Sequence, residues 1–260
     1  MALLSMAIYS TQENKKDALL ERTFKSILDT VDFKNHRMIV SVNGYTEKTV
    51  SILKYYQPLF EKVIYNNSNL GTAEAINLCW KERKQGEHTI KMDDDVEIHS
   101  AGWVDEMEEV IRRDATIGQV GLKRKDLIES PWNKDPFYKS NLMMLPHNPG
   151  EKWMIAEKVN HVMGTCVMHS VALLNTVGYL FQMKGNKYGF DDSLMSLRSR
   201  LAGFKNVFLP NIEIDHIDPG ATPFQKWKEQ NASSYWAEYH KTVADYQSGK
   251  LPLYYSPLEK

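Results

Sequence analysis

The sequence predicts a single α/β domain with a mostly parallel central sheet and helices on both faces. Two observations carry this prediction. Short apolar runs alternate with amphipathic segments as far as residue 122, and such alternation produces right-handed βαβ units. The fourth apolar run ends in three consecutive carboxylates, Asp93 to Asp95, and ligands of open α/β sheets bind at the carboxyl ends of strands.

The first half should contain five strands separated by helices. The apolar runs predict strands at residues 3–9, 36–42, 62–65, 87–95 and 117–122. Four intervening segments have helical apolar spacing: the one with Leu20, Phe24 and Ile27, residues 46–56, the one with Ala73, Ile76 and Trp80, and the one with Trp103, Met107 and Val110. Ser100 is expected to be the N-cap of the last of these helices.

The second half is less regular. Residues 123–158 contain several prolines and aromatic residues, and a loop this long is usually a lid or a binding loop. We expect a strand at 159–169, a helix at 170–177, a helix opened by Asp191 and Asp192, two short strands at 206–209 and 211–216, and a helical C-terminal extension at 219–260.

The composition excludes several classes of protein. The chain has 260 residues, of which 42% are hydrophobic and 25% charged, with a formal net charge of -1, so it should fold into a core and is not a uniformly basic nucleic-acid binder. Both cysteines, Cys79 and Cys166, lie in apolar patterns and look like buried thiols. No segment has the length or flanks of a membrane span or a signal peptide. We therefore expect a soluble, cytoplasmic protein.

The three acidic residues predict a cation site. Adjacent carboxylates repel each other by roughly 4 kcal/mol per close pair at an effective dielectric of about 20. Side chains alternate along a strand, so Asp93 and Asp95 should point the same way and Asp94 the other way. Asp93 and Asp95 would then suit a hard ion such as Mg²⁺ or Mn²⁺. His216, which lies among further acidic residues near the chain's last predicted strand, is either structural or another ligand of that ion.

A second acidic pair, Asp191 and Asp192, opens a predicted helix. One of the two would suit the first turn, where backbone N–H groups lack partners. The other is available as a general base for a hydroxyl nucleophile. We expect Asp192 to be the base, with Asp191 as the alternative.

At this point the motifs resemble one family, the inverting glycosyltransferases with the GT-A fold that are grouped as family 2. The resemblance covers residues 3–218 and depends on five segments in order: Ala7–Thr11, Val40–Gly44, Asn69–Asn77, Met92–Val96, and Gly189–Arg198 with Pro210 and His216 after it. The family's acidic pair is usually Glu-Asp, whereas this chain has Asp191-Asp192. The acidic residue common after the second strand is replaced by Asn43.

The resemblance implies a function for each half. Residues 1–122 would bind the nucleotide sugar, 123–158 would form a loop or lid, and 159–218 would face the acceptor. The implied contacts to the donor are Ser10, Thr11, Asn43, Asn69, Gly71, Asn77, Asp93 and Asp94. The implied reaction is a metal-dependent, inverting transfer from a nucleoside-diphosphate sugar, with UDP as the expected nucleotide, to a hydroxyl group.

Two other functions remain open at this stage. The chain could be a non-catalytic nucleotide-sugar binder, or a nucleotidyltransferase that uses the same acids. The acceptor could be a glycan, a lipid-linked sugar, a protein or a nucleic acid. The C-terminal segment, with Trp227 and Trp236, could pack over the acceptor site, form a homodimer or touch a membrane surface.

Overall fold

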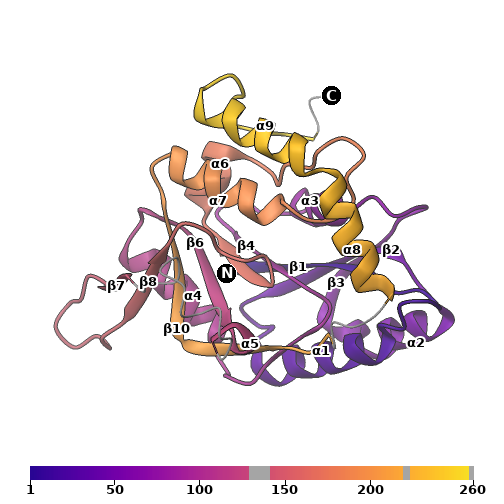
Figure 1. Ribbon diagram of the computed structural model, residues 1–260. Helices are drawn as coiled ribbons and strands as arrows, with labels where there is room; N and C mark the ends of the chain where they lie inside the picture. Colours follow the sequence, from indigo (N-terminus) through magenta and orange to yellow (C-terminus); the bar gives the residue numbers. More distant parts are fainter. Residues whose placement is uncertain (129–140, 219–222, 258–260) are drawn as a thin grey trace.

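The computed structural model describes residues 1–128, 141–218 and 223–257. In these residues, a ten-stranded mixed sheet carries helices on both faces, which confirms the predicted α/β class (Figure 1). The strands are β1 Ala2–Tyr9, β2 Arg37–Gly44, β3 Phe60–Tyr65, β4 His88–Met92, β5 Val96–Ile98, β6 Ile117–Arg124, β7 Asn141–Met144, β8 Ile155–Val159, β9 Cys166–His169 and β10 Lys205–His216. Their order is β3-β2-β1-β4-β9-β6-β10-β8-β7, and β5 pairs with β10.

The helices follow the predicted alternation in the first half of the chain. They are α1 Asp17–Thr30, α2 Glu47–Tyr55, α3 Thr72–Trp80, α4 Trp103–Arg113, α5 Lys125–Ile128, α6 Val171–Val177, α7 Asp191–Leu201, α8 Pro223–Ser234 and α9 Trp236–Gln247, with a 3₁₀ turn η1 at Gln57–Leu59. None of the helices described has the length and apolarity needed to cross a bilayer. Helix α2 begins with a capping box in which Thr46 and Thr49 satisfy each other's backbone N–H groups. The predicted cap Ser100 is wrong, because Gly102, with φ of +75°, precedes α4.

Strands β3, β2, β1 and β4 form an all-parallel half-sheet. Strand β1, between β2 and β4, is buried on both faces, as parallel strands usually are. Leu4 belongs to the larger core, which also contains Phe24 of α1 and Trp103 of α4. Leu3 belongs to the core on the other face, where α3 and α6 pack. Both faces of β1 are therefore fixed, and the loops at its carboxyl end have a rigid base.

The second half of the sheet departs from the predicted strands. Strand β9 runs antiparallel between β4 and β6. The strand predicted at 159–169 contains only the last residue of β8, then a loop, and then β9. Residues 206–209 and 211–216 are one long strand, β10, with an irregularity in its pairing after Leu209. Proline at 210 removes a backbone donor, and strands tolerate this at such irregularities.

The acidic residues do not lie within a strand. Strand β4 ends at Met92, and Asp93 to Asp95 form the bend before the short strand β5. The prediction that they continue the strand is wrong, although they do follow its carboxyl end. Because β5 pairs antiparallel with residues 214–216 of β10, the bend is joined to the last strand of the sheet.

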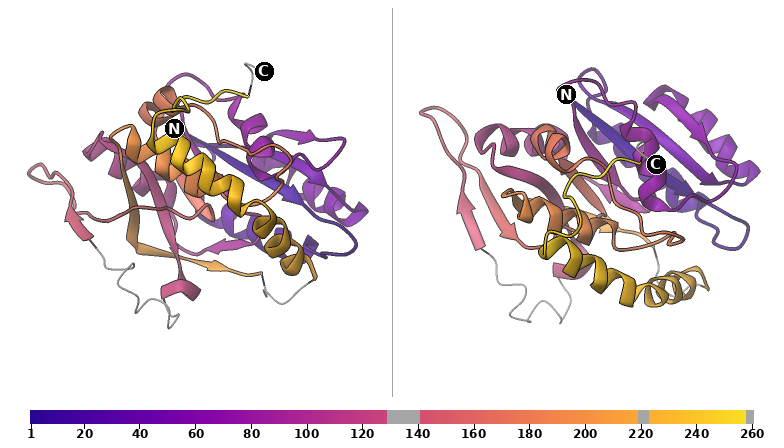
Figure 2. Two further views of the ribbon diagram at one scale, coloured as in Figure 1. Left: turned by 45° about the horizontal axis from the view of Figure 1, so that its top comes forward. Right: turned by 90° about the horizontal axis from the view of Figure 1, so that it is seen from above.

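The C-terminal extension forms α8 and α9, as predicted, and its residues 219–222 and 258–260 lie outside the described residues. Figure 2 shows these two helices along one side of the molecule, with hairpin β7–β8 at the end of the sheet away from β3. That hairpin lies in the segment predicted to be a loop, of which residues 129–140 are not described. The tail returns to the body, where Tyr255 accepts a hydrogen bond from the N–H of Tyr179 at 2.8 Å and donates one to Val177 at 3.0 Å.

Candidate active site

A cavity of about 540 Å³ opens at the carboxyl ends of β1 and β4. Both acidic groups predicted from the sequence line it, Asp93 to Asp95 from one side and Asp191 with Asp192 from α7. Among the described residues that line it, seven are carboxylates and four are cationic: Asp93, Asp94, Asp95, Asp126, Asp191, Asp192 and Asp218 against Lys16, Lys91, Arg124 and Lys228. The cavity is therefore net acidic.

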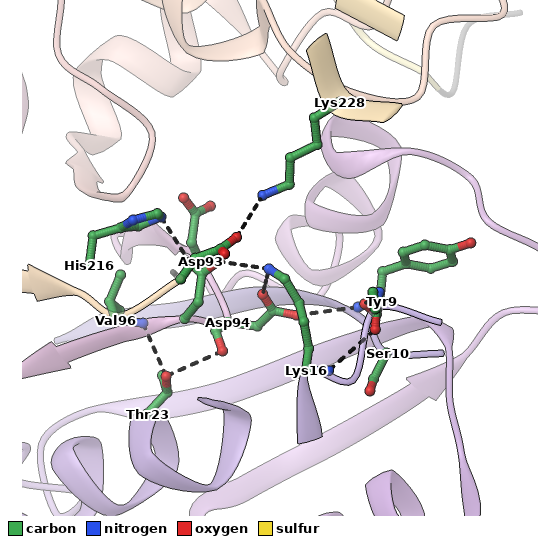
Figure 3. A network of polar contacts seen from close by, with 12 residues as sticks. Tyr9, Ser10, Lys16, Thr23, Asp93, Asp94, Val96, His216 and Lys228 are labelled. Atoms are coloured by element: carbon green, nitrogen blue, oxygen red, sulfur yellow. Dashed lines mark hydrogen bonds and ion pairs between the residues drawn. The ribbon is translucent and has the colours of Figure 1, made fainter. Parts of the chain in front are cut away.

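Two of the three consecutive acids share one lysine. The ammonium of Lys16 lies 2.9 Å from Asp94 Oδ1 and 2.7 Å from Asp95 Oδ2 (Figure 3). Burial alone would lower the pKa of Lys16, but the two carboxylates outweigh burial and raise it above its ordinary value. The expected alternation, with Asp94 turned away from Asp95, is wrong because a bend replaces the strand at these residues.

The hydroxyl of Thr23 fixes the bend from below. It donates to the carbonyl of Asp94 at 3.2 Å and accepts from the N–H of Val96 at 3.1 Å. Figure 3 shows Thr23 beneath the acids, on α1. The backbone that carries the carboxylates is therefore held in place before any ligand binds.

Asp95 and His216 fit a divalent cation. Asp95 Oδ1 is buried without a hydrogen-bond partner among the described residues, and His216 Nε2 lies 3.5 Å from it. Burial opposes ionisation of Asp95, but Lys16 and His216 outweigh it and keep the pKa of Asp95 below its usual range. Burial also lowers the pKa of His216, which favours the neutral imidazole that binds metals. Arg124 Nη2 donates to Nδ1 of this ring at 3.2 Å, so the neutral ring carries its proton on Nε2. A metal bound at Nε2 would require this contact with Arg124 to change.

Asp93, the other predicted metal ligand, has a different environment. Its side chain is 35% exposed and lies 3.9 Å from the ammonium of Lys91. Desolvation raises the pKa of Asp93 to about 7, against the opposing effect of Lys91. Among the described residues, two triplets of metal-ligating side chains converge within 4.8 Å, His36 with Asp105 and Glu108, and Glu97 with His99 and Asp215. Asp93, Asp95 and His216 are not such a triplet, so Asp93 would have to move to join the other two.

Lys91 connects the two acidic groups. Its ammonium lies 3.1 Å from Asp191 Oδ2 and is almost fully buried. Gly164 makes room for it, because a Cβ at that position would lie 2.2 Å from the Lys91 nitrogen. Lys91 therefore balances the charge of Asp191 in the lining of the cavity.

Asp192 is held by backbone and imidazole donors. Its Oδ2 accepts from the N–H of Gly164 at 3.0 Å and its Oδ1 from the N–H of Ser193 at 2.8 Å. His161 Nε2 lies 3.3 Å from Oδ2. Burial opposes ionisation, but His161, Lys91 and the Gly164 N–H hold the pKa of Asp192 well below its usual range. Asp192 is ionised at neutral pH and faces the cavity.

Most residues predicted to contact the donor have hydrogen-bond partners within the chain. Apart from Asp93 and Asp94, they do not line the cavity among the described residues: Ser10 donates to Asp17, Thr11 forms a turn with Asn14, Asn43 donates to Gly71, Asn69 accepts from Gly71, and Asn77 exchanges two hydrogen bonds with Leu180. These hydrogen bonds shape the loops around the cavity. A role in donor binding for these side chains stays a prediction.

No motif in the sequence predicts the cationic residues of the cavity. Lys91 lies two residues before Asp93, between the apolar residues Ile90 and Met92, and a lysine in a predicted buried strand is the available signal. Lys16 and His161 lie in loops with no motif. Only the folded chain brings them to the acids.

A family model, glycosyl transferase family 2, matches residues 10–178. Among curated proteins, none matches the sequence significantly. Similar solved structures share the fold at low identity. The mannosyltransferase PcManGT from Pyrobaculum calidifontis, in complex with GDP-Man and Mn²⁺, has a TM-score of 0.68 at 14% identity over 94% of this chain and 64% of its own.

Two further structures are similar to the chain. GalNAc-T7 with UDP, GalNAc and Mn²⁺ has a TM-score of 0.60 at 15% identity, over 92% of this chain and 50% of its own. S. aureus TarS 1-349 in complex with UDP-GlcNAc has a TM-score of 0.59 at 13% identity, over 83% and 58%. This chain thus spans between half and just under two thirds of the three proteins that it resembles.

Proposed function

Because the chain belongs to glycosyl transferase family 2, we propose that it transfers a sugar from a nucleoside-diphosphate donor, most simply a UDP-sugar, to a hydroxyl acceptor with inversion at the anomeric carbon. The observation that carries this proposal is the single cavity lined by both acidic groups. Three similar structures contain GDP-Man, UDP or UDP-GlcNAc. They support a nucleotide-sugar donor, and two of them support UDP.

The charges of the cavity support a metal-dependent reaction. A sugar diphosphate is anionic, and the seven carboxylates of the cavity outnumber its four cationic side chains. Asp95 and His216 would hold Mn²⁺ or Mg²⁺, with Asp93 joining them. Bound there, the ion would neutralise the diphosphate and stabilise it as a leaving group.

Asp192 is the base in this proposal. Its carboxylate would accept the proton of the acceptor hydroxyl as the oxygen attacks the sugar, and the diphosphate would leave from the opposite side. One displacement of this kind inverts the anomeric configuration. Asp191, paired with Lys91, would provide a fixed polar surface beside the sugar that is transferred.

We also propose that the protein is cytoplasmic. Cys79 and Cys166 are free and buried, which fits the reducing cytoplasm expected from the sequence.

The experiment is a panel of radiolabelled nucleotide sugars incubated with the protein, with Mn²⁺ or with a chelator, followed by analysis of the released nucleotide and of the anomeric configuration of any product. We expect hydrolysis or transfer from one donor, with Mn²⁺ only. Asp95→Asn should lose it, whereas Asp215→Asn, a partly exposed position on β10 that is paired with His99, should keep it. Turnover of a nucleoside triphosphate without any sugar donor would favour a nucleotidyltransferase, and binding of a donor without turnover would favour a binding protein.

A further inference from the structure

The acidic bend already has an internal cation. The side chains of Lys16, Asp94 and Asp95 are 8%, 8% and 3% exposed, and the lysine ammonium is within 2.9 Å of both carboxylates. A charge pair this deeply buried is stable only when each charge has its partner. Lys16 is that partner for two acids at once.

The loop after β1 delivers Lys16 to this position. Asn14 donates to the carbonyl of Tyr9 at 2.8 Å and accepts from the N–H groups of Thr11 and Lys16. Lys15, with φ of +51°, turns the chain into α1. In Figure 3, Lys16 rises from this loop and points at Asp94. The position of the ammonium is therefore built into the loop.

Lys16 and a metal ion would share Asp95. The ammonium pairs with Oδ2 of Asp95, whereas Oδ1, which lacks a hydrogen bond, faces His216. An ion bound at Oδ1 and His216 would lie only a few ångströms from the ammonium, and like charges at that separation repel strongly in a site removed from water. A divalent ion that binds without a nucleotide would therefore be repelled by the ammonium of Lys16.

A diphosphate changes this balance, because it is an anion that both cations can contact. We propose that Lys16 is the resident counter-ion of Asp94 and Asp95, that it weakens the binding of a free metal ion, and that it turns to the diphosphate when a nucleoside diphosphate binds. Metal and nucleotide then bind cooperatively, and each raises the affinity of the other by the same factor. This inference rests on the proposed metal and diphosphate site, and it is independent of the sugar and the acceptor.

The test measures binding of Mn²⁺ and of UDP separately, by electron paramagnetic resonance for the ion and by calorimetry for the nucleotide. Lys16→Met should bind Mn²⁺ alone at least about tenfold more tightly than the parent, because the competing charge is gone. At saturating Mn²⁺, it should bind UDP about tenfold more weakly, because an ammonium that contacts the diphosphate is lost. The two affinities move in opposite directions, which a general loss of structure does not produce.

Two variants serve as controls. Lys25→Met removes a lysine from the exposed face of α1, the helix that follows Lys16, where Lys25 pairs with Asp29, and both affinities should stay at parental values. Lys16→Arg keeps the charge and should keep the weak binding of Mn²⁺ alone.

The Lys16→Met variant leaves two buried carboxylates without a counter-ion, so thermal unfolding is measured with and without Mn²⁺. A larger Mn²⁺-induced rise in Tm than in the parent, or folding only when Mn²⁺ is present, supports the inference, since a ligand that binds the folded state stabilises it. Equal or weaker Mn²⁺ binding by Lys16→Met overturns it while leaving the proposed transferase intact. A parent protein that binds no Mn²⁺ even with UDP overturns both this inference and the proposed metal site.

Discussion

Asp191 and Asp192 are adjacent residues with different surroundings, and the roles proposed for them rest on this difference. Asp191 is buried against Lys91, whereas Asp192 accepts two backbone N–H groups and faces the cavity. Asp192→Asn should lower the rate of transfer by about 10²- to 10⁴-fold, since an amide cannot take the acceptor's proton. Donor binding measured by calorimetry should change little.

The matched variant is Asp191→Asn, which removes the charge that faces Lys91. It should alter donor affinity or stability more than Asp192→Asn does. If Asp192→Asn transferred at the parental rate and Asp191→Asn did not, the base would be Asp191. If both retained full rates, the single-displacement mechanism would have no base.

Gly164 is the residue on which both acids of α7 depend. Its N–H binds Asp192, and its missing Cβ leaves room for the ammonium of Lys91. Gly164→Ala should displace Lys91 and lower kcat/KM by about 100-fold, since a shift of about 1 Å in a catalytic site can cost that much. Lys91→Met should have a similar effect, and the double variant should be no worse than either single variant, because both remove the same arrangement. Additive losses in this double-mutant cycle would contradict the shared role.

Among single residues, the sequence predicts the acids that line the cavity and does not predict its cations. Asp93, Asp95 and Asp192 belong to motifs that can be recognised in order along the chain. Lys16 and His161 belong to none, because their positions depend on how two loops fold against strands that are far away in the sequence. Ser10, Asn43 and Asn77 were predicted to contact the donor, yet their hydrogen bonds go to the chain itself.

Among the strands, β6 has no room for a side chain at Gly121, where β10 and the loop that contains Val162 approach it closely. A Cβ at Gly121 would lie 2.3 Å from a methyl carbon of Val162 and 2.9 Å from the ring of Phe208. Gly121→Ala should destabilise the protein by ~1–3 kcal/mol through overpacking, measured by urea unfolding with an unchanged m-value.

Removing the obstructing methyl groups is the control for this prediction. Val162→Ala in the Gly121→Ala background should recover part of the lost stability, so the double variant should be less destabilised than the sum of the two single variants. Strict additivity would show that the clash does not determine the cost.

Parallel elements were more predictable than antiparallel ones. Strands β1 to β4 alternate with helices, and the apolar pattern of each strand is sufficient to identify it. Strand β5 has three residues and is ordered by pairing with β10, more than 110 residues later in the chain. No local pattern indicates such a partner, and the same holds for β8, most of which lies in the segment predicted to be a loop.

For the whole molecule, a buried histidine predicts sensitivity to acid. His169 of β9 is 1% exposed and packs on Trp80, with ring centroids 4.9 Å apart. Burial, aided by the charge of Lys91, lowers the pKa of His169 from 6.5 to about 3. Between these values the unfolded chain binds a proton that the folded chain does not, so stability falls as the pH decreases through this window, and the loss is complete below about pH 3.

The His169→Met variant tests this origin of the acid sensitivity. Its free energy of unfolding should fall less between about pH 6.5 and pH 4, by up to roughly 1.4 kcal/mol per pH unit, than that of the parent. Urea unfolding at several pH values measures the difference. Parallel curves for the two proteins would assign the acid sensitivity to other groups.

The pairing of β5 with β10 has a consequence for how the protein is made. On the ribosome, β1 to β4 can pair as soon as they emerge, since their partners are close in the chain. The bend that carries Asp93 to Asp95 is joined to the sheet through residues 214–216, and His216 and the acids of α7 are also synthesised late. A nascent chain of 122 residues therefore contains the acids of the donor side and no closed cavity. The cavity is therefore complete only after synthesis has passed Lys228, the last of its described lining residues.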